Sequence, residues 1–76
     1  MRKPSQDILE TLASNIRKLR SEKGLSQEEL SYRSGLHRTY VGAVERKEKN
    51  PTLASLELFA NALETNISYL LLNHSE

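Results

Sequence analysis

Apolar residues recur at spacings of three and four along most of the chain, which is the period of an amphipathic helix. Over residues 7–23 this spacing predicts one helix, and Gly24 follows where a left-handed C-terminal cap would sit. No segment shows the alternation of apolar and polar residues that is typical of a half-buried strand. The apolar face of the first helix consists of Leu9, Leu12, Ala13, Ile16 and Leu19.

Two short helices follow, joined by a tight turn. Ser26 and Glu29 form the Ser-x-x-Glu pattern of a capping box, which predicts a helix over about residues 27–34. Gly35 ends that helix, and a third helix is expected to begin at residue 37 or 38 and to continue through residue 46. Two short helices joined by a turn that contains glycine form a helix-turn-helix. Their core residues are Leu30, Leu36, Val41 and Val44.

Two further helices are predicted in the last third of the chain. The charged loop 47–51 ends in a proline, Thr52 can cap a fourth helix, and after a kink at residues 64–65 Asn66 can cap a short fifth helix. The pattern therefore indicates an all-α domain of five short helices around one core. The fourth helix has the core face Leu53, Leu56, Phe59, Ala60 and Leu63, and the fifth carries Ile67, Leu70 and Leu71.

The length fits a single domain over residues 1–76. A domain of this size buries only about 60% of the surface of its unfolded chain, and disulfides, metals or oligomerisation usually compensate. The sequence has no cysteine, which excludes disulfides and thiolate metal sites and suits a reducing cytoplasm. We therefore expect a cytoplasmic protein that oligomerises and uses no metal or other cofactor.

Neither a membrane segment nor a secretion signal is expected. No run approaches the roughly 20 apolar residues of a membrane span, and residues 1–7 are polar, with no signal-peptide core after them. The charges divide unequally: all eleven Lys and Arg residues and seven acidic residues lie in residues 1–50, whereas residues 51–76 contain three acidic residues and no Lys or Arg. This division indicates a pole that faces a polyanion, chance imbalance in a short chain being the alternative.

Four stretches of the chain carry a family pattern: IRKLR (16–20), GLSQEEL (24–30), GLHRTYV (35–41) and VER (44–46). Together they closely resemble the Cro/repressor-type (XRE) helix-turn-helix family, over about residues 8–72. Within that family, residues 38–46 followed by Asn50 are most similar to the controller proteins of restriction–modification systems. The resemblance implies a five-helix, lambda-repressor-like fold and a homodimeric transcriptional regulator that binds palindromic operators in double-stranded DNA.

Candidate base-reading residues lie at the start of the third helix. The major groove, about 12 Å wide, admits one α-helix, whose N-terminal residues meet the base edges. Arg38 can donate two hydrogen bonds to guanine, Thr39 offers a hydroxyl and a methyl group, and a merely solvated Arg38 is disfavoured because a cation opposes the helix dipole there. Tyr40 is either half-buried core or, as the resemblance implies, a DNA contact. Gly42 and Ala43 either permit close approach to DNA or have no role, and the predicted base-reading set is Arg38, Thr39, Tyr40 and Ala43.

Phosphate contacts are expected on both sides of the reading residues. Gln27 stands at the first position of the second helix, where the resemblance implies a phosphate contact and where free N–H groups can bind an anion. Three cations, Arg46, Lys47 and Lys49, cluster beyond the first turn of the third helix, which argues against a reading of each as an ordinary solvated surface charge. Arg33 could be either a phosphate contact or such a surface charge. The predicted phosphate set is Gln27, His37, Arg46, Lys47, Lys49 and Asn50.

The resemblance also implies a partly buried ion pair between Arg20 and Glu45. This pair would fix the third helix, which carries the base-reading residues and is called the reading helix below, against the first helix. Its role would be structural. Two positions depart from the family pattern, because Lys47 and Glu64 stand where the family usually has the glycine that ends a helix. A non-glycine residue in the left-handed region costs roughly 1 kcal/mol. These helix ends are therefore expected to be strained or differently shaped.

The last third carries more apolar side chains than one small core can use. Leu58 and Ala62 lie on a different side of the fourth helix from its core residues, and Tyr69 and Leu72 lie off the inward face of the fifth helix. Such a patch marks a partner surface, scattered surface residues being the alternative. A two-fold homodimer through these residues would place two reading helices about 34 Å apart, one turn of DNA.

Other functions find less support. An enzyme is not expected, because His37 and His74 are isolated, no acid–His–nucleophile arrangement or phosphate loop is present, and no small-molecule pocket is evident. A plasmid- or phage-type repressor, or the antitoxin of a toxin–antitoxin pair, is the alternative regulatory context. An antitoxin usually adds a toxin-binding arm, and only four residues follow Leu72.

Overall fold

The structure, a computed structural model, describes residues 4–74, with side chains from Ile8 onward. These residues form α1 (Pro4–Glu22), α2 (Gln27–Ser34), α3 (Arg38–Glu45), α4 (Leu53–Ala62) and α5 (Ile67–Leu71), and no strand. The predicted all-α class and the five helices are confirmed, although α1 begins earlier than expected. Residues 1–3, part of the segment interpreted as unlike a secretion signal, lie outside the described range. No described helix is long and apolar enough to cross a membrane.

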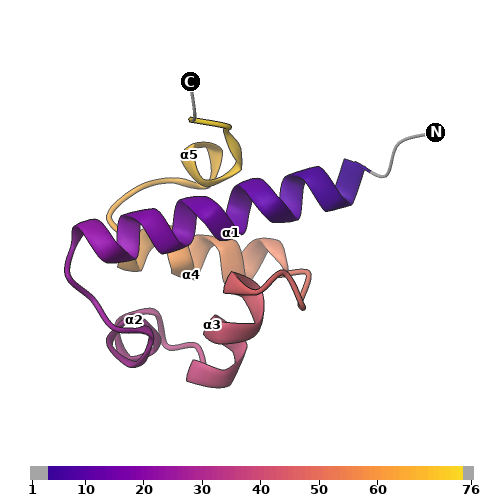
Figure 1. Cartoon of the computed structure of the whole chain (residues 1–76). Coiled ribbons are helices and arrows are strands. Elements are labelled where there is room, and N and C mark those ends of the chain that lie inside the picture. Colours follow the sequence, from indigo (N-terminus) through magenta and orange to yellow (C-terminus); the bar gives the residue numbers. More distant parts are fainter. Residues whose placement is uncertain (1–3, 75–76) are drawn as a thin grey trace.

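Helix α1 lies across the middle of the fold, between the helix-turn-helix and the C-terminal helix (Figure 1). It contacts α3 on one side and α5 on the other, while α2 packs against both α3 and α4. The last helix, α5, also contacts α4. Because α1 touches both α3 and α5, it connects the predicted reading helix to the end of the chain that is predicted to dimerise.

Local side-chain caps explain where the helices begin and end. The Ser26 side chain accepts a hydrogen bond from the Glu29 backbone N–H at 3.0 Å, and the Ser26 N–H donates to the Glu29 carboxylate at 2.9 Å, so the predicted capping box is present. Gly35 ends α2 with φ of 78°, a left-handed conformation that costs glycine little. Thr52 and Asn66 cap α4 and α5, as their positions predict.

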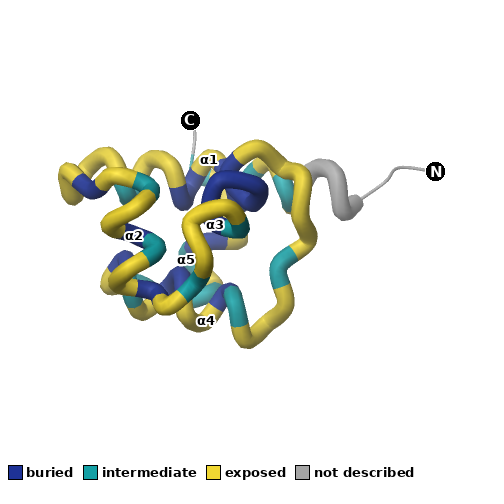
Figure 2. Tube along the Cα trace, turned by 90° about the horizontal axis from the view of Figure 1, so that it is seen from below, coloured by how far each residue is buried: buried dark blue, intermediate teal, exposed yellow. Residues whose placement is uncertain are grey.

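The core forms where all five helices turn their apolar faces inward (Figure 2). Phe59 is fully buried at its centre, and burial of one such side chain stabilises the fold by about 1.5–3 kcal/mol. The assignment of Leu53 to the core face of α4 is wrong, because its side chain is 74% exposed. Leu53 has the spacing of a core residue, but it stands in the first turn of α4, outside the buried cluster. The largest fully buried side chains are Phe59, Leu12, Ile16, Leu30, Leu63, Leu70, Val41 and Val44.

Two helix ends carry a non-glycine residue in the left-handed region, as their departure from the family pattern suggests. Lys47 has φ of 66° and Glu64 has φ of 60°. The Lys47 Nζ lies 3.2 Å from a carboxylate oxygen of Glu10, and the Glu64 carboxylate lies 2.8 Å from the Nζ of Lys23. Lys47 is thus tied to α1, and Glu64 to the turn that follows α1, by exposed ion pairs.

Candidate nucleic-acid interface

A shallow groove lies between the start of α2 and the exposed face of α3. Arg38 and Thr39 stand in the first turn of α3, and both are exposed. The Arg38 guanidinium lies 3.6 Å from the carboxylate of Glu28, but both side chains are more than two thirds exposed, so this pair holds Arg38 only weakly. The groove is lined by Gln27, Glu28, Arg38, Thr39, Gly42 and Arg46.

His37 caps the reading helix, a role that the sequence analysis missed. Its Nδ1 accepts a hydrogen bond from the Thr39 backbone N–H at 3.0 Å, which satisfies one of the free N–H groups at the start of α3. The signal for this role was its position directly before the helix, although histidine is not among the usual capping residues. The ring's Nε2 takes no part in the cap, so a phosphate contact through that atom stays a prediction.

The remaining two predicted base-reading residues are less exposed than Arg38 and Thr39. The Tyr40 ring stacks on Phe59, with centroids 6.5 Å apart and planes 20° from parallel, and the side chain is half-buried. Tyr40 therefore fills part of the core while keeping an accessible side. Ala43 is only 8% exposed, so little of its methyl group is accessible, and its base-reading role stays a prediction.

Glu45 is the point where side chains of α1 and α2 fasten the reading helix α3. Its carboxylate, 2% exposed, accepts hydrogen bonds from Arg20 Nε at 2.7 Å and Nη2 at 3.0 Å, so the two residues form the pair that the sequence analysis expected. Gln27 Nε2 donates to the same carboxylate at 2.9 Å, which uses one of its two N–H groups and leaves the other. Arg17, which the sequence analysis missed, donates to the Glu45 backbone carbonyl. Its spacing of three from Arg20 on α1 was the available signal.

The cations after α3 differ in how they are held. Arg46 donates to the two carboxylate oxygens of Glu48 from Nε and Nη2, both at 3.1 Å. This hydrogen-bonded pair lowers the pKa of Glu48 and raises that of Arg46. Lys47 is drawn toward Glu10 on α1, whereas Lys49 is exposed in the loop that precedes α4. Asn50, also predicted to contact phosphate, is exposed beside Lys49.

The residues predicted to form a dimer surface are not equally accessible. Leu58 is 40% exposed and Leu72 is 58% exposed, so both present apolar surface to solvent. Ala62 is partly buried and packs against the core. The Tyr69 ring is half-buried and stacks on His74, with centroids 3.8 Å apart. Leu58 and Leu72 therefore carry most of the exposed apolar surface of this set.

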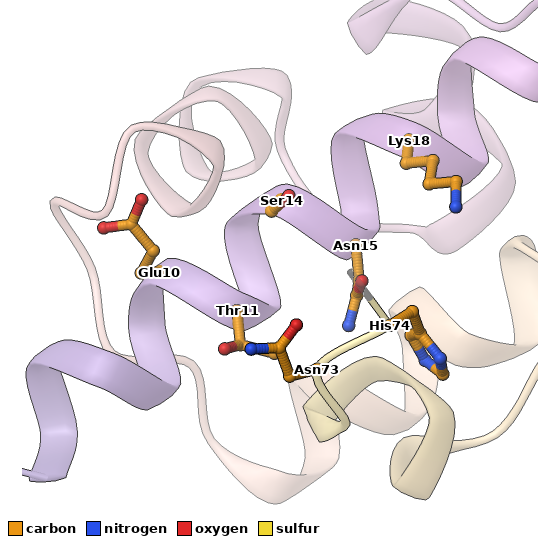
Figure 3. A pocket seen from close by; sticks show the side chains of 7 residues that line it. All are labelled: Glu10, Thr11, Ser14, Asn15, Lys18, Asn73 and His74. Atoms are coloured by element: carbon orange, nitrogen blue, oxygen red, sulfur yellow. The ribbon is translucent and has the colours of Figure 1, made fainter. Parts of the chain in front are cut away.

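Asn15 holds the end of the chain against α1, a contact that the sequence analysis did not find. It is 6% exposed, and its Nδ2 donates to the backbone carbonyls of Leu70 at 2.9 Å and Leu72 at 2.8 Å, with that of Tyr69 at 3.3 Å. Figure 3 shows its amide directed from α1 toward the segment that carries His74. The signal was a polar residue within the apolar stripe of α1.

The groove offers guanidinium, amide and hydroxyl donors, the groups that bind phosphate oxygens and base edges. The helices that carry these donors are fixed to the rest of the fold by buried contacts. Across residues 8–74, no group of three or more His, Asp or Glu side chains is placed to hold a metal ion.

Comparison with known proteins gives a consistent result. Residues 16–70, more than half of the chain, match a family described as helix-turn-helix. The control protein C.SmaI of Serratia marcescens is 55% identical over 65 residues, which cover 86% of this chain and 77% of that protein.

Solved structures of similar proteins share the fold. The restriction–modification controller protein C.AhdI from Aeromonas hydrophila superposes with a TM-score of 0.78 at 44% identity, covering 82% of this chain and 94% of that one. The controller protein C.Esp1396I, solved as a tetramer in complex with its natural 35 base-pair operator, has a TM-score of 0.77 at 41% identity and covers 83% of each chain.

Proposed function

The chain belongs to the helix-turn-helix family, and from that membership we propose that it is a sequence-specific DNA-binding transcriptional regulator. The observation that carries the proposal is the exposed first turn of α3, where Arg38 and Thr39 face a groove while Glu45 anchors the other end of the helix. A helix presented in this way can enter the major groove with its N-terminal residues against the bases.

Within this proposal, Arg38 and Thr39 read bases. The Arg38 guanidinium donates to O6 and N7 of a guanine, and the weak pair with Glu28 yields to that contact because both side chains are already largely in solvent. Thr39 lies next to Arg38 and offers its methyl group to a thymine. Tyr40 contributes only through the part of its ring that Phe59 leaves uncovered.

Phosphate contacts flank these residues. Gln27 retains one amide N–H beyond its bond to Glu45, and the free backbone N–H groups at the start of α2 lie beside it. Lys49 and Asn50 serve the DNA backbone from the loop after α3, where both are exposed. Lys47 would have to leave Glu10 to reach a phosphate, so its contribution is smaller than its charge suggests.

We assign the working form as a homodimer that pairs through α4 and α5. The exposed side chains of Leu58 and Leu72 give this end of the molecule apolar surface, and residues 51–76 contain no Lys or Arg that would be repelled from a second copy. Two basic ends then face outward, and a two-fold pair matches a palindromic site. The operator-bound tetramer of C.Esp1396I is consistent with such an assembly.

The physiological role that fits best is control of a restriction–modification system in the cytoplasm, with no catalytic step assigned to the chain. C.SmaI, C.AhdI and C.Esp1396I all carry the name of control or controller proteins. Adjacent genes for a methyltransferase and an endonuclease would support this role. An adjacent toxin gene would instead favour an antitoxin.

In vitro selection from a pool of random double-stranded DNA tests the proposal directly. The chain should enrich an inverted repeat whose half-sites are centred about one helical turn apart. Arg38→Ala should lose part of that preference, whereas Arg33→Ala, which removes an exposed arginine of α2 outside the groove, should retain it. Failure to enrich any sequence would overturn the proposed function, and enrichment of a single unrepeated half-site would overturn the dimer.

A further inference from the structure

Gly42 lies in the middle of the reading helix, where glycine is an unfavourable choice. Glycine in a helix interior has more backbone freedom to lose than alanine and no side chain to pack. The residue is nevertheless buried, although it lines the groove on the exposed side of α3. Side chains from other positions must therefore cover it.

Arg46 and Gln27 provide that cover. A Cβ atom at position 42 would lie 3.0 Å from the Nη1 of Arg46, 3.8 Å from its Cζ and 3.5 Å from the Oε1 of Gln27. Arg46 follows Gly42 by one helical turn, so its long side chain folds back over the surface that a side chain at 42 would occupy. The Nε and Nη2 of the same guanidinium are bound to Glu48, which leaves Nη1 over the glycine.

We infer that Gly42 is a positioning residue, a seat that lets the Arg46 guanidinium lie within the reading groove beside Gln27. Glu48 holds the guanidinium through Nε and Nη2, and the missing side chain at Gly42 admits Nη1. Arg46 then presents its charge to a phosphate of the DNA backbone from within the groove, close to the start of α2. This inference rests on the proposed function.

The seat has an unusual consequence for a Gly42→Ala substitution. The added methyl group meets the far end of a flexible side chain, which can swing away at little cost, and φ at this position is not left-handed. Alanine also stabilises a helix interior relative to glycine. The substitution should therefore keep or raise the unfolding temperature while it displaces Arg46, so that fold stability and DNA affinity move in opposite directions.

A double-mutant cycle separates this role from its alternatives. The probe is a duplex that carries the inverted repeat recovered by selection, and the variants are Gly42→Ala, Arg46→Ala and both together. Gly42→Ala should weaken binding roughly ten- to hundredfold per protomer, in line with the loss of one hydrogen bond to a charged group. In the Arg46→Ala background the same change should have no further effect. Ser14→Ala adds helix propensity on an exposed face of α1 and should leave the affinity unchanged.

Two results would overturn the inference. If Gly42→Ala weakened binding equally in both backgrounds, the methyl group would be meeting DNA directly and Arg46 would be irrelevant to it. If Gly42→Ala bound as tightly as the parent while Arg46→Ala did not, Arg46 would not depend on the glycine for its position. A parent protein that does not prefer the selected duplex would instead contradict the proposed function itself.

A spectroscopic measurement supplies a readout that does not depend on DNA. In the free protein the Arg46 Nε–H is bonded to Glu48, so its NMR resonance reports the position of the guanidinium. Gly42→Ala should shift this resonance, and Ser14→Ala should not. An unchanged resonance in Gly42→Ala would also overturn the inference that Gly42 positions Arg46.

Discussion

Arg20 and Glu45 meet through two hydrogen bonds, 2.7 and 3.0 Å long, across the contact between α1 and α3. The carboxylate is almost completely buried, whereas the arginine side chain retains about a fifth of its surface in solvent, 21%. Gln27 Nε2 binds the same carboxylate at 2.9 Å. The end of the reading helix is thus fixed to the long helix and to the start of α2 at one point.

Removal of Arg20 should therefore destabilise the whole domain. Arg20→Ala leaves the Glu45 carboxylate buried without its main partner, and loss of one member of a buried pair costs about 3–5 kcal/mol. The free energy of unfolding, measured in urea, checks this value. Lys23→Ala breaks an exposed pair and should cost far less. Equal losses in the two variants would show that burial of Glu45 does not decide the cost.

Asn15→Asp should loosen α5. The substitution preserves the shape of the side chain but replaces its N–H donors with a carboxylate that faces the carbonyls of Leu70 and Leu72. Leaving buried groups unsatisfied costs about 1–3 kcal/mol. We expect a lower unfolding free energy and, because Leu72 lies at this end of the chain, a weaker dimer in analytical ultracentrifugation. Ser14→Ala, on the neighbouring exposed position, should lower neither quantity.

Leu72→Asp should dissociate the dimer, because a charge would enter its apolar surface without a partner. Leu58→Asp should have the same effect from α4. Light scattering would show the mass of one chain in place of two. Ile8→Asp, at a residue that is 49% exposed on α1, is the matched control and should stay dimeric. A dimer that survives both changes on α4 and α5 would place the contact on another face.

Arg38→Ala and Lys49→Ala should affect DNA binding in different ways. Loss of Arg38 should cost about 1–3 kcal/mol at one base pair of each half-site and relax specificity there. Loss of Lys49 should weaken binding to all sequences alike and reduce the slope of affinity against salt by about one per protomer, or about two for the dimer. Competition binding with single-base operator variants, repeated at several salt concentrations, distinguishes the two. A uniform loss for Arg38→Ala would remove it from the base-reading set.

Glu64→Gly should stabilise the protein, most strongly in acid. At φ of 60° glycine relieves the strain of the left-handed conformation, but the substitution also removes the pair with Lys23. Because Lys23 lowers the pKa of Glu64, the pair stabilises the fold at neutral pH, and this contribution is lost as the pH falls through the lowered pKa.

The rise in unfolding temperature on Glu64→Gly should therefore be larger in acid than at neutral pH. Glu57→Gly introduces glycine inside α4, where it should lower the unfolding temperature. A Glu64→Gly variant that melts below the parent even in acid, where the ion pair no longer contributes, would show that relief of backbone strain at this position does not stabilise the fold.

The helices and their ends were predictable because local interactions set them. The capping box of Ser26 and Glu29 involves residues three apart, and Gly35 needs only its own backbone freedom to end α2. In both cases the deciding atoms lie within a few residues along the chain. The left-handed ends at Lys47 and Glu64 were instead indicated by the resemblance to the family, which usually has a glycine at each of these positions.

Part of the candidate interface was also predictable from the sequence. The position of Arg38 and Thr39 in the first turn of α3 follows from the turn at Gly35, so their exposure was expected. The burial of Ala43 was not expected. The helical period indicates which positions share a face, but not which of these faces another part of the fold covers. Leu53 failed for the converse reason, since its spacing fits the core face of α4 but its place in the first turn lies outside the buried cluster.

The sequence by itself determined an all-α helix-turn-helix chain with exposed candidates for DNA contact on its third helix, since periodicity and caps are local properties. Only the tertiary structure decided what holds that helix in place and what lies over it. Asn15 reaches carbonyls 54 to 57 residues away, and Arg46 folds over Gly42 toward Gln27 on another helix. Such contacts depend on how the helices pack, because packing alone brings residues distant in sequence within bonding distance.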